Sequence, residues 1–251
     1  METQVFKVPE SFKKDFKYTF CPGCDHGVAI RLVGECLDEL GIRDNAIIAA
    51  SIGCSVTIYD FLNIDALESP HGRAMAEATG IKRARPDKFV FTYQGDGDFA
   101  SIGLAEGVHA ALRGEKLSAI CINNTTYGMT GGQLGPTTMM GQVTTTSPTG
   151  RNAEYYGYPI RIAEHIALCE GTAFSARVSL DSVANIRKAK QAIKKAFEVQ
   201  LQGLGLGFVE ILSGCPTNWR MTPEQSHERV KNEMQKTFPL GIYKDVTAET
   251  K

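Results

Sequence analysis

The sequence lacks an excess of either charge, since 27 Lys and Arg residues stand against 28 Asp and Glu residues. A net charge of −1 gives no electrostatic reason to expect nucleic acid or an anionic membrane as a partner. The chain also lacks any run of 18 apolar residues, so no transmembrane helix is expected. Its first ten residues lack the features of a signal peptide, which points to the cytoplasm and to reduced cysteines.

Domain boundaries are lacking as well. No internal repeat and no linker divides the 251 residues, and a hydrophobic content of 43% is typical of a globular protein. We therefore expect a single domain over residues 1–251, long enough to bury a substantial core. Residues 1–20 show no clear period and predict an N-terminal arm, whereas about the last forty residues predict a polar C-terminal tail with one or two short helices.

Apolar runs alternate with amphipathic stretches along the chain. The expected strands are 46–51, 89–93, 117–122, 172–179 and 207–212, and the expected helices are 25–40, 71–82, 100–113, 160–169 and 183–202. This alternation predicts an α/β fold with a doubly wound, mostly parallel sheet. Residues 125–158 form a long loop rich in Gly, Thr and Pro, and loops of that length are usually functional.

Two short motifs follow neighbouring strands of the predicted sheet. Residues 95–98 read Gly-Asp-Gly-Asp, and the 25 residues 98–122 separate Gly97 from the pair Asn123-Asn124. That interval holds one helix and one strand, which would return the chain to an adjacent parallel strand. Asp96 and Asn124 would then lie at the carboxyl ends of two strands, where open α/β sheets bind ligands. Mg²⁺ combines protein oxygens with phosphates, so the motifs predict a Mg²⁺-diphosphate site, although an ordinary turn is the alternative.

Seven cysteines are present, and they fall into two groups. Three lie within helical or apolar patterns and are expected to be buried: Cys36, Cys121 and Cys169. Four lie beside Gly or Pro in expected loops: Cys21, Cys24, Cys54 and Cys215. Thiolates suit zinc or an iron–sulfur cluster, and the scattered loop positions favour a [4Fe–4S] cluster. Zinc, or a redox pair of Cys21 and Cys24, is the alternative.

Together these motifs resemble the β subunit of 2-oxoacid:ferredoxin oxidoreductases of the 2-oxoisovalerate or 2-oxoglutarate type. The matching segments are residues 21–24, 52–55, 71–73, 95–98, 124–133 and 214–216. The resemblance implies the diphosphate-binding half of the thiamin diphosphate-binding fold. It also implies CoA-dependent oxidative decarboxylation of a 2-oxo acid to acyl-CoA and CO₂. The implied cofactors are thiamin diphosphate, Mg²⁺ and one [4Fe–4S] cluster that passes electrons to ferredoxin.

The same resemblance assigns roles to individual residues. It implies that Cys21, Cys24, Cys54 and Cys215 ligate the cluster. It implies that Asp96, Asn124 and the backbone carbonyl of Thr126 bind Mg²⁺. Cofactor contacts are implied for Ile52, Gly53, Cys54, Ser55, Gly95, Gly97, Asp98, Asn124, Gly128, Met129 and Thr130. His71 is expected near the cofactor and is the candidate catalytic residue, with a helix-capping or core histidine as the alternative.

A partner is expected because one functional group is missing. Thiamin enzymes need a carboxylate at the aminopyrimidine ring, whereas Glu77 and Glu106 look like ordinary helix residues. The resemblance places that glutamate on an α subunit carrying the pyrimidine-binding half, and ferredoxin or a ferredoxin-like small subunit would accept the electrons. The apolar side chains of loop 125–158 also suggest that a partner covers part of it.

Other functions and the substrate stay open at this stage. A thiamin diphosphate-dependent non-redox decarboxylase or lyase subunit is one rival, and a non-catalytic metal-binding module is another. No Lys or Arg lies between Asn124 and Arg151, and the distal carboxylate of 2-oxoglutarate would need a cation. An apolar pocket therefore favours a substrate like 2-oxoisovalerate, unless the partner supplies an arginine.

Overall fold

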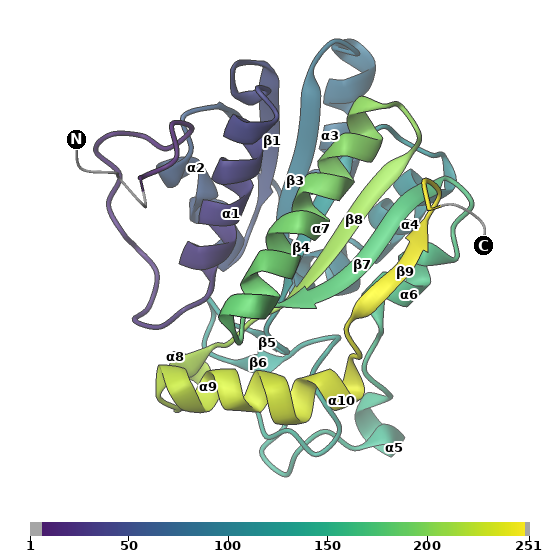
Figure 1. The fold of residues 1–251 in the computed structure, drawn as a ribbon. Helices are drawn as coiled ribbons and strands as arrows, with labels where there is room; N and C mark the ends of the chain where they lie inside the picture. Colours follow the sequence, from purple (N-terminus) through teal and green to yellow (C-terminus); the bar gives the residue numbers. More distant parts are fainter. Residues whose placement is uncertain (1–6, 249–251) are drawn as a thin grey trace.

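A mixed sheet with the order β2-β1-β3-β4-β8-β7-β9 forms the centre of the computed structural model, which describes residues 7–248 (Figure 1). Its strands are β1 (Ala46–Ser51), β2 (Asp65–Ser69), β3 (Phe89–Gly95), β4 (Ser118–Asn123), β7 (Thr172–Ser179), β8 (Leu206–Leu212) and β9 (Gly241–Asp245). Every neighbouring pair is parallel except β7 and β9. The prediction of a doubly wound, mostly parallel α/β sheet is confirmed.

Helices cover both faces of the sheet (Figure 1). On one face lie α1 (His26–Glu39) and α7 (Val183–Leu201), and on the other lie α3 (Ala74–Ala84), α4 (Leu104–Leu112) and α6 (Ile162–Ala167). Alternate residues of β3 supply the two apolar cores, since Phe91 packs with the first set and Val90 with the second. The close contact of α7 with β8 requires a glycine, because a Cβ at Gly207 would lie 2.5 Å from the Ala196 carbonyl oxygen.

Shorter elements complete the fold. They are α2 (Ile58–Phe61), α5 (Ala153–Tyr156), α8 (Pro216–Trp219), α9 (Pro223–Arg229), α10 (Gln235–Thr237), the hairpin of β5 (Thr126–Tyr127) and β6 (Gln133–Leu134), and turns at Arg43–Asn45, Cys54–Thr57, Asp98–Ile102 and Val230–Met234. The long loop 125–158 contains only β5, β6 and α5, as its sequence indicated. Among residues 7–248, no helix combines the length and apolar character that crossing a bilayer requires.

Three sequence expectations need correction. The C-terminal tail is not only polar and helical, because β9 pairs with β7 as an edge strand. The helix expected from residue 71 begins at Ala74, since Gly72 has φ of +78° and cannot belong to a right-handed helix. The helix expected from residue 100 begins at Leu104, because a π-helical turn, Asp98–Ile102, precedes it. Of the predicted N-terminal arm, residues 1–6 lie outside the described residues.

Candidate functional site

One cavity at the carboxyl ends of β1, β3 and β4 contains every residue predicted to contact Mg²⁺ or the cofactor. Its lining comprises His26, Ile52, Gly53, Cys54, Ser55, His71, Gly95, Asp96, Gly97, Asp98, Asn124, Thr126, Tyr127, Gly128, Met129 and Thr130. These residues come from five separate segments of the chain, and most of them meet because parallel strands present their carboxyl ends on one edge of the sheet. The predicted convergence is therefore present, and the individual ligand roles stay predictions.

Asp96 is the best candidate for a metal ligand. Its side chain is only 2% exposed, and burial raises its pKa to about 7. The Thr137 hydroxyl donates a hydrogen bond to Oδ2, but among residues 7–248 no Lys, Arg or His forms an ion pair with this carboxylate. A buried carboxylate without a cation is unfavourable, so a divalent ion at this position would compensate the charge.

Asn124 offers the second side-chain ligand. Its Oδ1 accepts a hydrogen bond from the Thr126 backbone N–H at 3.1 Å, which fixes the side chain over its own turn. An amide oxygen has two lone pairs, so one stays available for a metal ion. The donor set of carboxylate, amide oxygen and backbone carbonyl is composed of hard oxygens, as Mg²⁺ prefers.

Glycines give the cavity its shape at two points. Gly53 has φ of +116°, a conformation that only glycine adopts readily, where β1 leads into the Cys54–Thr57 turn. A Cβ at Gly97 would lie 2.3 Å from the Tyr127 ring, so a larger residue would displace this aromatic wall. Both positions fit a backbone that must approach a diphosphate closely.

Asp98 is buried and does not point freely into the cavity. Its Oδ1 accepts hydrogen bonds from Ser51 Oγ at 2.7 Å, His71 Nδ1 at 2.5 Å and the Gly72 N–H at 2.6 Å. Its Oδ2 accepts one from Gln94 Nε2 at 2.5 Å. The carboxylate therefore already accepts from four donors within the chain, and the contact of Asp98 with the cofactor stays a prediction.

His71 is thereby oriented for chemistry in the cavity. Because a carboxylate only accepts, the ring must carry its proton on Nδ1 when neutral, which leaves the Nε2 lone pair free. The alternative of a core or capping histidine does not fit a side chain that lines the cavity and is one-third exposed. This geometry suits a general base or a hydrogen-bond acceptor.

The four loop cysteines line an adjoining cavity, which shares His26, Cys54, Asn124, Gly128 and Met129 with the first. Burial raises the pKa of Cys24 to about 12 and that of Cys54 to about 11, and neighbouring thiolates add to both shifts. The described residues contain no group of three ligands close enough to hold a single metal ion. The four thiolates of this cavity suit an iron–sulfur cluster or zinc, and the [4Fe–4S] cluster stays a prediction.

The remaining three cysteines behave as predicted. Cys36, Cys121 and Cys169 are buried, at 0%, 0% and 7% exposure, and none lines either cavity.

Two residues that the sequence did not single out connect the cavities. His26 lines both, stacks on Phe20 and hydrogen-bonds through Nδ1 to the Tyr93 hydroxyl at 2.8 Å. Burial lowers its pKa to about 4, so it is neutral at neutral pH. Asn218 donates from Nδ2 to the Gly128 carbonyl at 2.9 Å and to Cys215 Sγ at 3.2 Å. Their closeness in sequence to Cys24 and Cys215 was the available signal.

Comparison with known proteins identifies relatives of the chain. The family described as "Thiamine pyrophosphate enzyme, C-terminal TPP binding domain" matches residues 48–210. Ketoisovalerate oxidoreductase subunit VorA of Methanothermobacter thermautotrophicus is 48% identical over 100% of this chain and 54% of its own length. 2-Oxoglutarate synthase subunit KorB of Methanocaldococcus jannaschii is 39% identical over 92% of this chain and 83% of its own length.

A solved structure shows the same fold. It is a 2-oxoglutarate:ferredoxin oxidoreductase from Magnetococcus marinus with 2-oxoglutarate, coenzyme A and succinyl-CoA bound. The similarity has a TM-score of 0.78 at 28% identity and covers 98% of this chain and 87% of that one. The chain spans about half the length of the two VorA relatives, so their whole activity involves sequence that this chain does not match.

Proposed function

The chain belongs to the family of 2-oxoacid:ferredoxin oxidoreductase subunits, and from that premise we propose that it is the β subunit of such an enzyme. The complete enzyme would decarboxylate a 2-oxo acid oxidatively, transfer the acyl group to CoA and pass electrons to ferredoxin. The observation that carries this proposal is the adjacency of two cavities: one holds Asp96 and Asn124 at strand ends, and the other holds four loop cysteines. Clusters of this kind are held by reduced thiolates, so we place the protein in the cytoplasm.

Each part of the site has a proposed task. Asp96, Asn124 and the Thr126 carbonyl would hold Mg²⁺, and the turns around Gly53, Gly97 and Gly128 would surround the diphosphate. Cys21, Cys24, Cys54 and Cys215 would hold one [4Fe–4S] cluster. When bound, thiamin diphosphate supplies the carbon nucleophile for decarboxylation, and the cluster accepts single electrons. Asp98 would fix the ring of His71, whose Nε2 would exchange a proton or a hydrogen bond with substrate or cofactor.

A partner subunit is proposed on two grounds. Among residues 7–248, no glutamate lines the cofactor cavity, so the carboxylate that activates the aminopyrimidine would come from an α subunit. Loop 125–158 also exposes apolar side chains, including Val143 at 66% and Tyr155 at 81%. Exposed apolar side chains grouped on one loop indicate an interface.

The substrate proposed here is a branched-chain 2-oxo acid such as 2-oxoisovalerate. Arg151 is the first cation after the Mg²⁺ ligands, and it is buried. Its guanidinium donates to the backbone carbonyls of residues 135, 136, 138, 156, 157 and 158. Arg151 is therefore occupied in holding the loop together and is unavailable to the distal carboxylate of 2-oxoglutarate.

The test is a substrate panel assayed with the assembled complex, CoA, thiamin diphosphate, Mg²⁺ and a viologen dye. We expect 2-oxoisovalerate to give the highest kcat/KM and the purified chain alone to give no turnover. CO₂ release without dye reduction, from protein free of iron, would instead support the non-redox lyase. Failure to bind thiamin diphosphate would support the metal-binding module, and full turnover by the isolated chain would refute the need for a partner.

A further inference from the structure

The backbone is strained between Asn124 and Thr126, two of the three proposed Mg²⁺ ligands. Thr125 has φ of +62°, in the left-handed region, and its side chain is fully buried. A β-branched residue is disfavoured there, so this conformation requires support from its surroundings. Because Thr125 joins Asn124 to Thr126, its φ and ψ angles set the distance between the proposed amide and carbonyl ligands.

Hydrogen bonds hold Thr125 on both sides. Its N–H donates to Asn123 Oδ1 at 3.0 Å. Its carbonyl accepts from Thr138 Oγ1 at 2.6 Å and from Gln142 Nε2 at 3.3 Å. The N–H contact is available only while the Asn123 amide keeps its oxygen toward Thr125.

Glu210 fixes that amide orientation. Asn123 Nδ2 donates to Glu210 Oε1 at 2.7 Å, and a carboxylate cannot donate in return, so the amide oxygen must face the other way, toward Thr125. Glu210 is itself fully buried on β8. An isolated charge there would be costly, so the interaction depends on a cation behind it.

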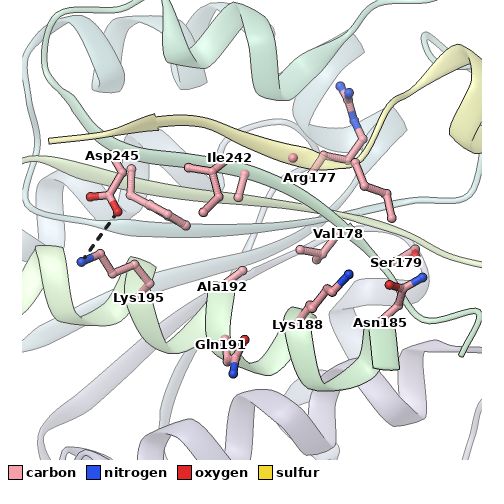
Figure 2. Close-up of a pocket in the computed structure, with 14 residues that line it drawn as sticks. Arg177, Val178, Ser179, Asn185, Lys188, Gln191, Ala192, Lys195, Ile242 and Asp245 are labelled. Atoms are coloured by element: carbon pink, nitrogen blue, oxygen red, sulfur yellow. Dashed lines mark ion pairs between the residues drawn. The ribbon is translucent and has the colours of Figure 1, made fainter. Parts of the chain in front are cut away.

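Arg177 provides this cation. Its Nε donates to Glu210 Oε2 at 2.9 Å, and the rest of the guanidinium bonds to Glu164, the Pro239 carbonyl and the Tyr243 hydroxyl. Figure 2 shows the Arg177 side chain turned away from the groove between α7 and β9, where Lys188 and Lys195 lie. The guanidinium therefore faces the α6 side of the sheet, where Glu164 lies, and it is not available to a ligand in that groove.

We propose that the buried chain Arg177–Glu210–Asn123 positions the metal site by holding Thr125 in its left-handed conformation. Mg²⁺ demands near-octahedral geometry at short distances, so a small rotation at Thr125 would separate Asn124 and Thr126 from one ion. The inference rests on the proposed function, since it assumes that these residues bind Mg²⁺. None of the three positioning residues lines the cofactor cavity.

The experiment measures Mg²⁺ affinity rather than activity. The assembled enzyme is freed of cofactor and titrated calorimetrically with Mg²⁺ at saturating thiamin diphosphate. Asn123→Ala and Glu210→Gln should each raise the Mg²⁺ dissociation constant by about tenfold or more, as loss of outer-shell support does at metal sites. Asn45→Ala removes a side-chain amide hydrogen bond of similar length, 2.8 Å to the Asp87 carbonyl, at the exposed amino end of β1, and it should change the dissociation constant less than about twofold.

A second substitution separates positioning from general destabilisation. Glycine adopts positive φ without support, so Thr125→Gly added to Asn123→Ala should recover most of the lost affinity. If Asn123→Ala does not fold, Glu210→Gln with and without Thr125→Gly provides the same comparison. Wild-type protein that binds no Mg²⁺ with thiamin diphosphate would overturn the proposed function and this inference together. Tight wild-type binding that the variants retain, or a loss that Thr125→Gly does not restore, would overturn the positioning role alone.

Discussion

Replacing Asp98 by Asn should disable His71 while the protein stays folded. The carboxylate accepts four hydrogen bonds, three of them at Oδ1, from Ser51, His71 and the Gly72 N–H. Asn keeps one oxygen for these three donors but removes the negative charge. Its new NH₂ group would meet Gln94, whose Oε1 is buried and unpartnered among the described residues. A flip of the Gln94 amide would supply the acceptor that this NH₂ group needs.

The cost to stability can be worked from these contacts. Hydrogen bonds to charged groups contribute about 1 kcal/mol more than neutral ones, so three retained bonds weaken by about 3 kcal/mol in total. Asp98→Ala would instead leave four buried donors without an acceptor. Each would cost about 1–3 kcal/mol of stability, so this variant risks unfolding. Asp98→Asn is therefore the informative variant, and its melting temperature should fall without loss of the fold.

Turnover should fall as well, because His71 loses the charged partner that orients its ring. If His71 acts as a general acid or base, losing its charged partner should lower kcat by about a hundredfold or more. The assay is viologen reduction by the assembled enzyme, with calorimetry to confirm that thiamin diphosphate still binds. His71→Gln should lower kcat similarly, and the double variant should be no slower than His71→Gln alone, because both act through one ring. If the two substitutions lower kcat multiplicatively, or if Asp98→Asn leaves turnover unchanged, then Asp98 does not act through His71.

Three further predictions follow from the site. Asp96→Ala should abolish binding of Mg²⁺ and thiamin diphosphate in calorimetric titrations while the fold survives, and unchanged affinity would contradict the metal assignment. Anaerobically purified protein should contain about four irons and four sulfides per chain. Substituting serine for any of Cys21, Cys24, Cys54 and Cys215 should remove the brown chromophore, whereas serine at Cys36, Cys121 and Cys169 should keep it; zinc in place of iron would refute the cluster. His227 stabilises the fold in a pH-dependent way, because its hydrogen bond to Asp25 raises the pKa of its ring. That contribution is complete below about pH 6.5 and is lost as pH rises through the raised folded-state pKa, so the melting-temperature advantage over His227→Gln should shrink as pH rises above about 6.5.

The central sheet was predictable because burial on both faces leaves a clear record in the sequence. Strands β1, β3 and β4 are nearly continuous apolar runs, and their ends were predicted to within two residues. The site motifs follow these strands directly, so locating the strands also located Asp96 and Asn124. The two edge strands were missed. β2 is mostly exposed and carries two acidic residues, and β9 is at most half-buried, so neither shows an apolar run.

Details of the site depend on contacts between distant segments, which periodicity does not reveal. Asp98 was expected to contact the diphosphate, yet four donors from β1, the residue 71–72 turn and β3 occupy its oxygens. The role of Arg151 is also invisible in the sequence, because its six carbonyl partners lie in an irregular loop. Such arrangements follow from the folded loop conformation rather than from local propensity.

The pairing of Arg177 with Glu210 could have been predicted from the sequence. Each is the single charged residue of a strand in which all residues are buried, and the two charges have opposite signs. The strands β7 and β8 are neighbours, and their register places Arg177 directly beside Glu210. A buried ion pair is a poor source of stability, so its presence at this depth argues for a task that requires geometry.

A double substitution of Arg177 and Glu210 separates the stability of the fold from the geometry of the metal site. Replacing the pair by apolar residues of similar size, as in Arg177→Met with Glu210→Leu, leaves no unpaired charge in the buried core, although the partly exposed Glu164 loses its ion pair with Arg177. The free energy of unfolding should therefore fall by less than the about 3–5 kcal/mol expected when one partner of a buried pair is removed alone. The Asn123 amide would then lose the acceptor that orients it, and Thr125 would lose its support. Mg²⁺ affinity should therefore fall by about tenfold or more, although the double variant still folds. A stable double variant that binds Mg²⁺ as tightly as wild type would show that the pair serves the fold and not the metal site.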